Sequence, residues 1–289
     1  MADQELYMLH NRDNTETQRL DAQHDILARF LGYELLHPSI SIELNNGVNI
    51  ADVGTGTGIW LKRLSSWIKS LPEASPCHLH GFEFPAEQGN IDFTIHDVTQ
   101  PFPSEHLGRY DIVHVRLFCL ALCESDLAKA LKNVVGLLRP NGYLQWEDAD
   151  FYTATPNRPS TEVTRVIERV TGYMADAGLS LRVSDLLMRE GKNLELQGLR
   201  KYEYSPLANP EHYAVIQLWG SQLYQAILHV AILRSGEAGD KAEAKAIASR
   251  MLEEMEAAYS DGIVPELRIY TVICRKDINY PELDDGHAM

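Results

Sequence analysis

A glycine-rich stretch with an acid before it is the part of this sequence whose residue types point most directly to chemistry. Residues 52–58 read Asp-Val-Gly-Thr-Gly-Thr-Gly and follow an apolar run that starts at Val48. Glycines there allow a sharp turn from strand to helix and let the backbone approach a ligand closely. The spacing G-x-G-x-G, with no Gly-Lys-Ser/Thr after it, excludes a P-loop. A turn that binds nothing remains an alternative.

Asp52 narrows the kind of ligand that this turn could hold. A carboxylate beside the pyrophosphate of a dinucleotide would repel it, whereas a ligand that carries an ammonium group would be attracted. Two further acids follow predicted strands, since Glu83 ends the second strand and Asp97 follows the third. Glu83 could accept hydrogen bonds from both hydroxyls of a ribose, and Asp97 could accept a hydrogen bond from the amino group of an adenine ring. Each acid alone could be a solvated loop residue, but together they predict a site at the carboxyl edge of a sheet, where ligands bind.

The elements that must position these acids alternate between strands and helices. Strands are predicted at 48–53, 78–84, 91–96, 110–115, 143–146, 194–204 and 267–274, and a turn is predicted at 139–142. Helices are predicted at 60–68, 127–138, 160–178 and 184–190, and two more begin at Asn209 and Asp240. This order predicts an α/β fold with a seven-stranded, mostly parallel, Rossmann-like sheet. We expect an N-terminal helical lid over 1–46 and a domain over 47–289, with a helical cap inserted between strands five and six at about 151–192.

Composition excludes several classes of protein. The 289 residues include 26 Lys and Arg against 41 Asp and Glu, a formal charge of −15. Without a basic run, binding to nucleic acid or to an anionic membrane is not expected. The first residues show no secretory signal, and no apolar run approaches the roughly 18–20 residues of a spanning helix. Four scattered cysteines (Cys77, Cys119, Cys123, Cys274) favour thiols in a reducing compartment over a disulfide framework or a zinc site, so a cytoplasmic protein is expected.

Four motifs resemble those of class I S-adenosylmethionine (SAM)-dependent methyltransferases. They are ADVGTGTGIW (51–60), GFEF (81–84), HDVTQPFP (96–103) and YDIVHVRL (110–117). The leader RLDAQHDILARFLGYELLHPSI (19–40) is similar to that of the branch that acts on fungal secondary metabolites, and within it the gliotoxin-type bis-thiomethyltransferases are most similar. The resemblance extends to about Arg275.

The resemblance implies SAM as cofactor, S-adenosylhomocysteine (SAH) as product, and a set of binding residues. Asp52 with Gly54, Thr55, Gly56 and Gly58 would hold the methionine part, and Glu83 with Phe84 the ribose. Asp97 and Val98 would hold the adenine, and Val115 and Arg116 would line the site. Relatives often have Asp and small residues where this chain has Glu83-Phe84-Pro85. Glutamate has the same chemistry with a longer reach.

A predicted N-terminal helix adds a separate indication. On a helix from Thr15 to Leu35, four apolar residues share a face, and Arg19, Gln23 and His24 fall on or beside it. Polar groups on a face that becomes buried need partners. Either this helix closes over the cofactor with Arg19 near its carboxylate, or Arg19 forms a local salt bridge.

Three carboxylates after the fifth strand are the candidates for a general base. Glu147, Asp148 and Asp150 could contact the acceptor, hold a metal, or lie in a solvated loop. No metal is expected, because metal-dependent catechol enzymes also place an acid after the fourth strand, and Val115-Arg116-Leu117-Phe118 has none. The same stretch lacks the Asn/Asp-Pro-Pro-Tyr/Phe of nucleic-acid amino-methyltransferases. Phe151, Tyr152, Tyr173 and Trp219 are candidates for holding the acceptor, although aromatic residues of amphipathic helices are mostly core.

The function predicted from these residues and the resemblance is S-methylation of a small fungal metabolite. The acceptor would be a free thiol of a reduced, gliotoxin-like dithiol, converted to its methylthio product. Two alternatives stay open. One is an O- or N-methyltransferase of another fungal metabolite, and the other is a regulator of secondary metabolism that kept the fold without the activity.

Overall fold

Seven strands form one sheet in the computed structural model, which describes residues 14–42, 47–72, 77–82 and 91–280. They are β1 (Asn49–Val53), β2 (His78–Phe82), β3 (Ile91–Thr94), β4 (Tyr110–Arg116), β5 (Leu138–Asp150), β6 (Gln197–Tyr204) and β7 (Arg268–Arg275). Their order is β3-β2-β1-β4-β5-β7-β6, and β7 runs antiparallel to both of its neighbours. The predicted seven-stranded, mostly parallel α/β fold is confirmed.

The strand order places a crevice at β1. The chain moves outward from β1 to β2 and β3 and then returns to β4 on the other side of β1. Connections on the two sides therefore leave the carboxyl ends of β1 and β4 in opposite directions. Ligands of open α/β sheets bind at such a reversal point.

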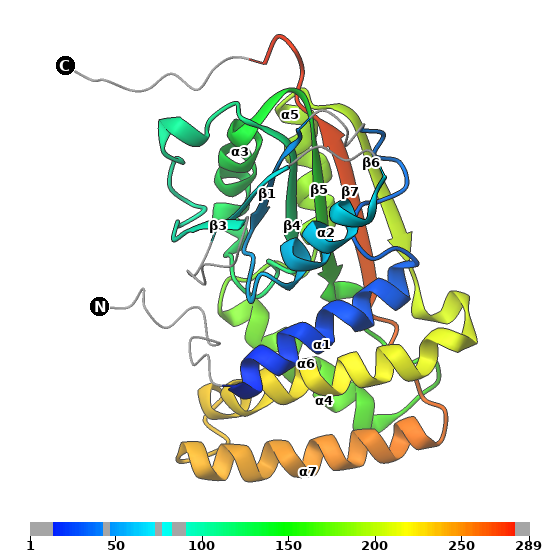
Figure 1. The fold of residues 1–289 in the computed structure, drawn as a ribbon. Coiled ribbons are helices and arrows are strands. Elements are labelled where there is room, and N and C mark those ends of the chain that lie inside the picture. The colour runs from blue at the N-terminus through cyan, green and yellow to red at the C-terminus, as the bar shows by residue number, and fades with distance from the viewer. Residues whose placement is uncertain (1–13, 43–46, 73–76, 83–90, 281–289) are drawn as a thin grey trace, which may run out of the picture.

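Helices cover both faces of the sheet because its strands are apolar on both sides. In β4 every residue from Tyr110 to Val115 is buried. One face packs against α2 (Ile59–Ser70), whose Trp60, Leu61 and Leu64 join the apolar residues of β1 and β2. The other face packs against α3 (Leu127–Leu137) and α5 (Val183–Asn193), as Figure 1 shows.

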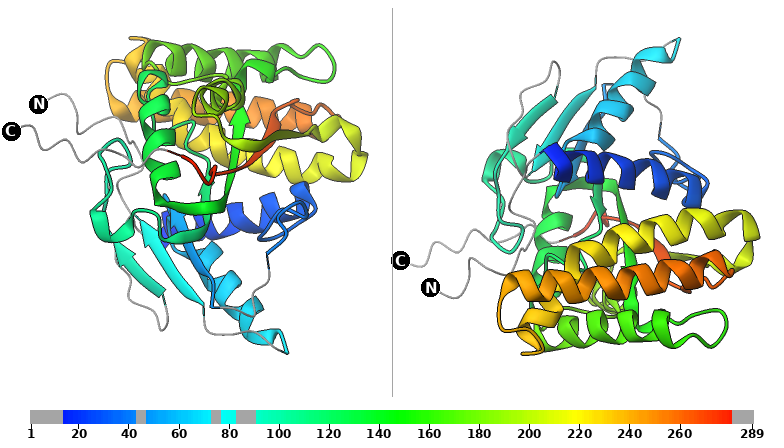
Figure 2. Two further views of the ribbon diagram at one scale, coloured as in Figure 1. Left: turned by 90° about the horizontal axis from the view of Figure 1, so that it is seen from above. Right: turned by 90° about the horizontal axis from the view of Figure 1, so that it is seen from below.

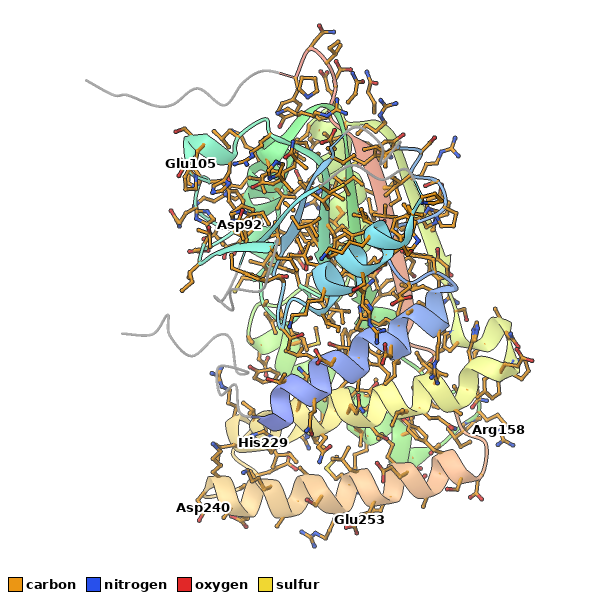
Figure 3. All side chains as sticks on the ribbon, in the orientation of Figure 1. Asp92, Glu105, Arg158, His229, Asp240 and Glu253 are labelled. Carbon is orange, nitrogen blue, oxygen red and sulfur yellow. The ribbon has the colours of Figure 1, made fainter. Side chains whose placement is uncertain are left out.

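A separate layer of helices lies across the carboxyl end of the parallel strands (Figures 1 and 2). It contains α1 (Asn14–Leu31), α4 (Thr161–Asp176), α6 (Tyr213–Arg234) and α7 (Lys241–Ser260). Helix α6 packs on α1, α4 and α7. Figure 3 shows Asp240 at the N-terminal end of α7 and Glu253 on its outer side, whereas Met251 and Met255 are buried. Helix α1 comes before the first strand, α4 is inserted between β5 and β6, and α6 and α7 are inserted between β6 and β7.

Several predicted helix starts are confirmed by their caps. The Ser160 hydroxyl accepts from the backbone N–H of Val163, and the Asp240 carboxylate accepts from Ala242 and Glu243. Asn209 caps Glu211 with Pro210 at the next position, but it begins a short 3₁₀ turn, and α6 follows at Tyr213. Short 3₁₀ helices span Ser104–His106, Glu124–Asp126, Phe151–Thr153, Pro206–Ala208 and Pro210–His212.

Among the predicted boundaries that are wrong, three have a local reason. Helix α1 ends at Leu31 rather than Leu35, because Gly32 adopts a positive φ of 77°. Strand β5 already begins at Leu138, and the predicted turn at 139–142 is an irregularity within it, with Asn141 at φ 64°. Strand β6 begins at Gln197, after Glu195 at φ 54°. No helix among the described residues has the length and apolar character needed to cross a membrane.

Candidate active site

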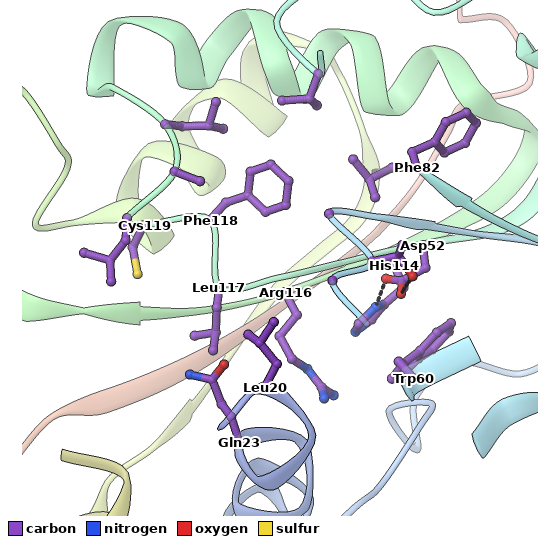
Figure 4. A pocket seen from close by; sticks show the side chains of 18 of the residues that line it. Leu20, Gln23, Asp52, Trp60, Phe82, His114, Arg116, Leu117, Phe118 and Cys119 are labelled. Carbon is purple, nitrogen blue, oxygen red and sulfur yellow. Dashed lines mark hydrogen bonds and ion pairs between the residues drawn. The ribbon is translucent and has the colours of Figure 1, made fainter. Parts of the chain in front are cut away.

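A cavity of about 820 Å³ lies at the carboxyl ends of β1 and β4, between the sheet and the helical layer (Figure 4). Its lining comes from segments far apart in sequence: α1, the glycine turn after β1, the segment after β3, the segment after β4, and α6. Among the predicted site residues, those that line it are Arg19, Asp52, Gly54, Thr55, Gly56, Asp97, Val98, Arg116, Phe151 and Trp219. The volume is in the usual range of pockets that enclose a small molecule.

Asp52 is held in place from two sides at the end of β1. Its side chain is buried, with the Thr55 hydroxyl donating to Oδ2 at 2.7 Å. The other oxygen, Oδ1, lies 2.7 Å from Nδ1 of His114 on β4. A carboxylate oxygen can accept more than one hydrogen bond, so Asp52 can also accept from a ligand.

Helix α1 covers the cavity with one face. Arg19, Leu20, Gln23, His24 and Leu27 all line it, at the spacing of successive turns. Thr57 of the glycine turn donates to Asp21 on α1 at 2.6 Å, which joins the turn to the helix. The predicted apolar and polar face of this helix, with Arg19, Gln23 and His24, therefore lines the cavity, while the role of Arg19 stays a prediction.

Asp97 and Val98 lie at the same cavity, after β3. Asp97 is exposed, and its Oδ1 accepts from the backbone N–H and the hydroxyl of Thr99 at 2.9 and 2.8 Å. Burial by itself would raise the pKa of Asp97, but these hydrogen bonds outweigh it and lower the pKa. Asp97 is therefore a carboxylate at neutral pH. Glu83 and Phe84 lie outside the described residues.

Two of the predicted binding residues lie away from the cavity. Val115 is buried in the core, and Gly58 does not contribute to the lining. Side chains alternate along a strand, so Val115 and its neighbour Arg116 face opposite sides. Gly58 precedes α2 and lies against the Phe93 ring.

The three acids predicted as base candidates do not line the cavity either. Their carboxylates are buried and accept hydrogen bonds from other parts of the chain. Glu147 accepts from Tyr33, Gln145 and Arg116, and Asp148 accepts from the backbone of Phe118 and Cys119. Asp150 accepts from both the backbone and the hydroxyl of Ser184 at the start of α5. Burial raises the pKa of Asp150 to about 6.

Glu147, Asp148 and Asp150 are buried because β5 continues to Asp150 between β4 and β7. What was expected as a loop is therefore the end of a central strand. None of the three lines the cavity, and none is placed to take a proton from a ligand inside it.

The acceptor candidates divide in the same way. Phe151 and Trp219 line the cavity, while Tyr152 and Tyr173 do not. The guanidinium carbon of Arg182 lies 4.2 Å from the centroid of the Tyr152 ring. The corresponding distance from Arg234 to the Tyr173 ring is 5.6 Å.

Sequence reasoning missed the stretch Leu117–Cys123, which lines the cavity with apolar side chains and two thiols. The sequence feature that could have indicated this part of the site is the apolar run directly after the fourth strand. His114 was also missed, although a histidine among Ile112, Val113 and Val115 is unusual in a buried strand.

The cysteines and the potential metal ligands of the described residues can be considered together. No disulfide joins the four cysteines. The described ranges contain no group of three or more His, Cys, Asp or Glu side chains arranged to hold a metal ion.

Comparison with protein families identifies the class of this chain. The family model described as "Methyltransferase domain" matches residues 16–185, more than half of the sequence. The matched region contains all but the first two residues of α1, the glycine turn and strands β1 to β5, and it contributes residues to the cavity lining. The chain belongs to the methyltransferase-domain family, and the predicted class is confirmed.

Several similar curated proteins come from fungi. Methyltransferase grgD of Penicillium sp is 37% identical over 180 residues, which cover 58% of this chain and 61% of that protein. N-methyltransferase gliN of Aspergillus fumigatus is 26% identical over 160 residues, covering 55% and 56%. N-methyltransferase sirN of Leptosphaeria maculans is 32% identical over 137 residues, covering 46% of each. The chain thus matches about half to three fifths of each relative's length.

Solved structures resemble this chain more distantly. Phosphoethanolamine N-methyltransferase 2 of Haemonchus contortus, in complex with SAM, has a TM-score of 0.49 and 12% identity, covering 90% of this chain and 52% of that one. The [4+2]-cyclase SpnF has a TM-score of 0.47 and 16% identity, covering 91% and 95%.

Proposed function

We propose that this protein is a SAM-dependent methyltransferase of fungal secondary metabolism that methylates a small, largely apolar acceptor. The observation that carries the proposal is the single cavity shared by the glycine turn, Asp52, Asp97 and the apolar stretch Leu117–Cys123. The lining combines carboxylates and two arginines, Arg19 and Arg116, with aliphatic and aromatic side chains.

The residues present fit SAM on two observations. The buried carboxylate of Asp52 lines the cavity, is held there by Thr55 and His114, and can accept a further hydrogen bond from an ammonium group. Arg116 also lines the cavity, and its buried Nη2 has no hydrogen-bond partner among the described residues. We assign the adenine to Asp97 and Val98, and the amino-acid end to Asp52, Arg116 and Arg19. When bound, SAM supplies an electrophilic methyl group on a positively charged sulfur.

The chain contributes mainly positioning. Holding two reactants in line removes most of the entropic barrier to their encounter. Leu27, Phe151, Trp219 and Leu223 surround the space beside the glycine turn and would exclude water from it. Transfer would form a bond between the methyl carbon and the acceptor atom. The former carbon–sulfur electron pair would stay on the sulfur of the product SAH.

We further propose a thiol as the acceptor atom, because Glu147, Asp148 and Asp150 do not line the cavity. A thiol with a pKa near 8.5 is partly ionised at neutral pH and needs little help from a base. A phenol or alcohol needs a positioned base, whose usual contribution is about 10²–10⁴-fold. Asp126 follows the stretch Leu117–Cys123 and does line the cavity, so it is the carboxylate to test as a general base. The thiols of this chain favour a reducing, cytoplasmic setting in which a dithiol substrate would stay reduced.

A second acceptor class has support of its own. The relatives gliN and sirN are named N-methyltransferases, and an unprotonated amine would suit the same apolar space without a base. A non-enzymatic regulator would bind cofactor without turnover, so all three functions are separated by one set of assays.

The test combines binding with methyl transfer. We expect calorimetry to detect SAH binding, and methyl-labelled SAM to transfer label to a reduced dithiol faster than to a matched amine or phenol. Turnover should rise with pH as the thiol ionises, and Asp126→Asn and Asp150→Asn should each reduce it less than about 100-fold. Absence of SAH binding would overturn the cofactor assignment. Binding with label only on the amine or phenol would overturn the thiol and keep the methyltransferase.

A further inference from the structure

A row of buried charged side chains crosses three neighbouring strands beneath the cavity. Asp52 on β1 contacts His114 on β4 at 2.7 Å, the pair joined by a dashed line in Figure 4. The other ring nitrogen of His114 lies 3.5 Å from Glu147 on β5, and Glu147 also accepts from Arg116. We call Asp52, His114, Glu147 and Arg116 the buried quartet. Strand pairing aligns its members, since Asp52 pairs with His114 and Arg116 with Glu147.

The charges of the quartet balance. Burial alone would lower the pKa of His114, but the hydrogen bond to Asp52 and the charges of Asp52 and Glu147 outweigh it and raise this pKa. Burial alone would raise the pKa of Glu147, whereas Arg116 and His114 hold it well below its usual range. These two directions favour the charged forms of His114 and Glu147, which lie between the side chains of Asp52 and Arg116. Buried charges are tolerated when they are paired and hydrogen-bonded in this way.

Further contacts hold the two central members, and His114 Nε2 reaches Glu147 as an ion-pair contact at 3.5 Å without a hydrogen bond in the described part of the chain. The His114 ring stacks on Trp60 of α2, with centroids 4.0 Å apart and planes 2° from parallel. Glu147 accepts from Tyr33 at 2.8 Å and from Gln145 at 2.7 Å. The neighbouring His24 of α1 meets Arg116 at 3.0 Å, and burial followed by the Arg116 charge lowers the pKa of His24 to about 4, so it adds no charge at neutral pH.

The ends of the quartet carry opposite charges. Asp52, His114 and Arg116 line the cavity, whereas Glu147 does not. Asp52 presents a carboxylate there, and Arg116 presents a guanidinium whose Nη2 has no partner in the described part of the chain. An α-amino acid carries an ammonium and a carboxylate on one carbon. Asp52 matches the first of these groups and Arg116 the second.

We propose that His114 and Glu147 are positioning residues that hold Asp52 and Arg116 as a matched pair for the zwitterionic amino-acid end of SAM. This inference rests on the proposed function. A purely structural network would support the whole cavity equally, whereas the quartet acts on one end of the ligand.

The first experiment compares two ligands that differ only at that end. SAH has the amino-acid end, and 5′-methylthioadenosine keeps the nucleoside and the thioether sulfur without it. In His114→Gln we expect the affinity for SAH, measured by calorimetry, to fall roughly ten- to hundredfold. The affinity for 5′-methylthioadenosine should stay within about twofold. His80→Gln is the matched control, because His80 lies on β2 outside the cavity and is hydrogen-bonded to Thr94 at 3.0 Å.

Equal losses for both ligands, or no loss for either, would overturn the inference and leave the proposed function standing. If wild-type protein binds neither ligand, the proposed function itself fails. Wild-type protein gives a further arm that needs no variant, with SAH analogues that lack only the amino or only the carboxylate group. Each should bind roughly tenfold or more weakly than SAH, and equal affinity of either analogue would contradict the pairing.

The second experiment tests the charge balance. His114→Gln leaves two carboxylates against one guanidinium, and Glu147→Gln leaves one carboxylate with two cations. The double variant restores one of each, so its loss of SAH affinity should be smaller than the product of the single losses. Independent losses that multiply would show that the two residues do not act as a unit, and would overturn the proposal.

Discussion

At the scale of single residues, Gly54 shows how tightly the cavity is built. Its φ of 71° lies in the left-handed region, and an added Cβ would lie 2.2 Å from the Phe118 ring. Gly32 has nearly the same φ, 77°, but an added Cβ there would meet nothing within 4 Å. Both glycines therefore have a positive φ that disfavours other residues, but only at Gly54 would an added Cβ collide with a side chain.

We expect Gly54→Ala to weaken SAH binding by more than tenfold and to destabilise the protein more than Gly32→Ala does. The control should cost only the backbone strain, about 1–2 kcal/mol. Urea unfolding and calorimetry measure the two effects. Because Phe118 is the colliding side chain, Gly54→Ala/Phe118→Ala should regain part of the stability, and no recovery would show that the ring is not the cause.

The glycine turn and the quartet also show why residue types alone are ambiguous. Asp52, Asp148 and Asp150 are all acids at the ends of strands. Asp52 lines the cavity, whereas Asp148 and Asp150 accept hydrogen bonds from the backbone N–H groups of Phe118 and Ser184. What a carboxylate can do depends on which donors reach it first.

At the scale of elements, α1 is the part of the fold that separates the cavity from solvent on one side. It rests on α6 and reaches the glycine turn through the Thr57–Asp21 bond of 2.6 Å. Asp25, one turn further along, pairs instead with Arg63, and both side chains are about half exposed, 55% and 49%. We propose that α1 is a lid whose closure depends on Asp21.

Asp21→Ala should weaken SAH binding roughly tenfold, because a hydrogen bond between the lid and the binding turn is lost. Asp25→Ala should change it less than about threefold, since exposed ion pairs contribute little. Calorimetry on the two variants provides the comparison. Hydrogen exchange adds a second readout, in which saturating SAH should slow exchange in α1 but not in α7. Equal effects of both substitutions would contradict the lid.

At the scale of the whole molecule, pH couples to stability through Asp150. The side chain is fully buried, and burial raises its pKa to about 6, although Ser184 donates twice to it. The unfolded chain releases this proton near pH 3.9. Between these values the folded protein holds more protons than the unfolded one, so this group lowers stability as pH rises from about 4 to 6.

Asp150→Asn removes that titration. From pH 4.5 to pH 7, wild-type protein should lose about 2 kcal/mol of unfolding free energy relative to the variant. Urea unfolding of both proteins at the two pH values measures the difference. A gap that does not change with pH would mean that Asp150 is not a buried titrating group.

The sequence by itself determined the local elements and their order. Apolar runs, the glycine turn and the caps at Ser160 and Asp240 each act within a few residues, so they can be read without knowing what packs against them. The alternation of strands and helices then fixed a parallel sheet with the acids after β1 and β3 at one edge, and Asp52 and Asp97 lie there. The sequence motifs predicted that the chain is a methyltransferase, and the family match confirms this class.

Only the tertiary structure decided which side chains meet. His114, Glu147 and Arg116 are ordinary residues of buried strands until the register pairs Asp52 with His114 and Arg116 with Glu147. Register between strands 62 or 31 residues apart is set by packing across the whole sheet, and no local signal encodes it. The same holds for α6, which completes the cavity from an insertion after β6. Contacts of this kind depend on the free energy of the assembled core, and they exist only once the chain has folded.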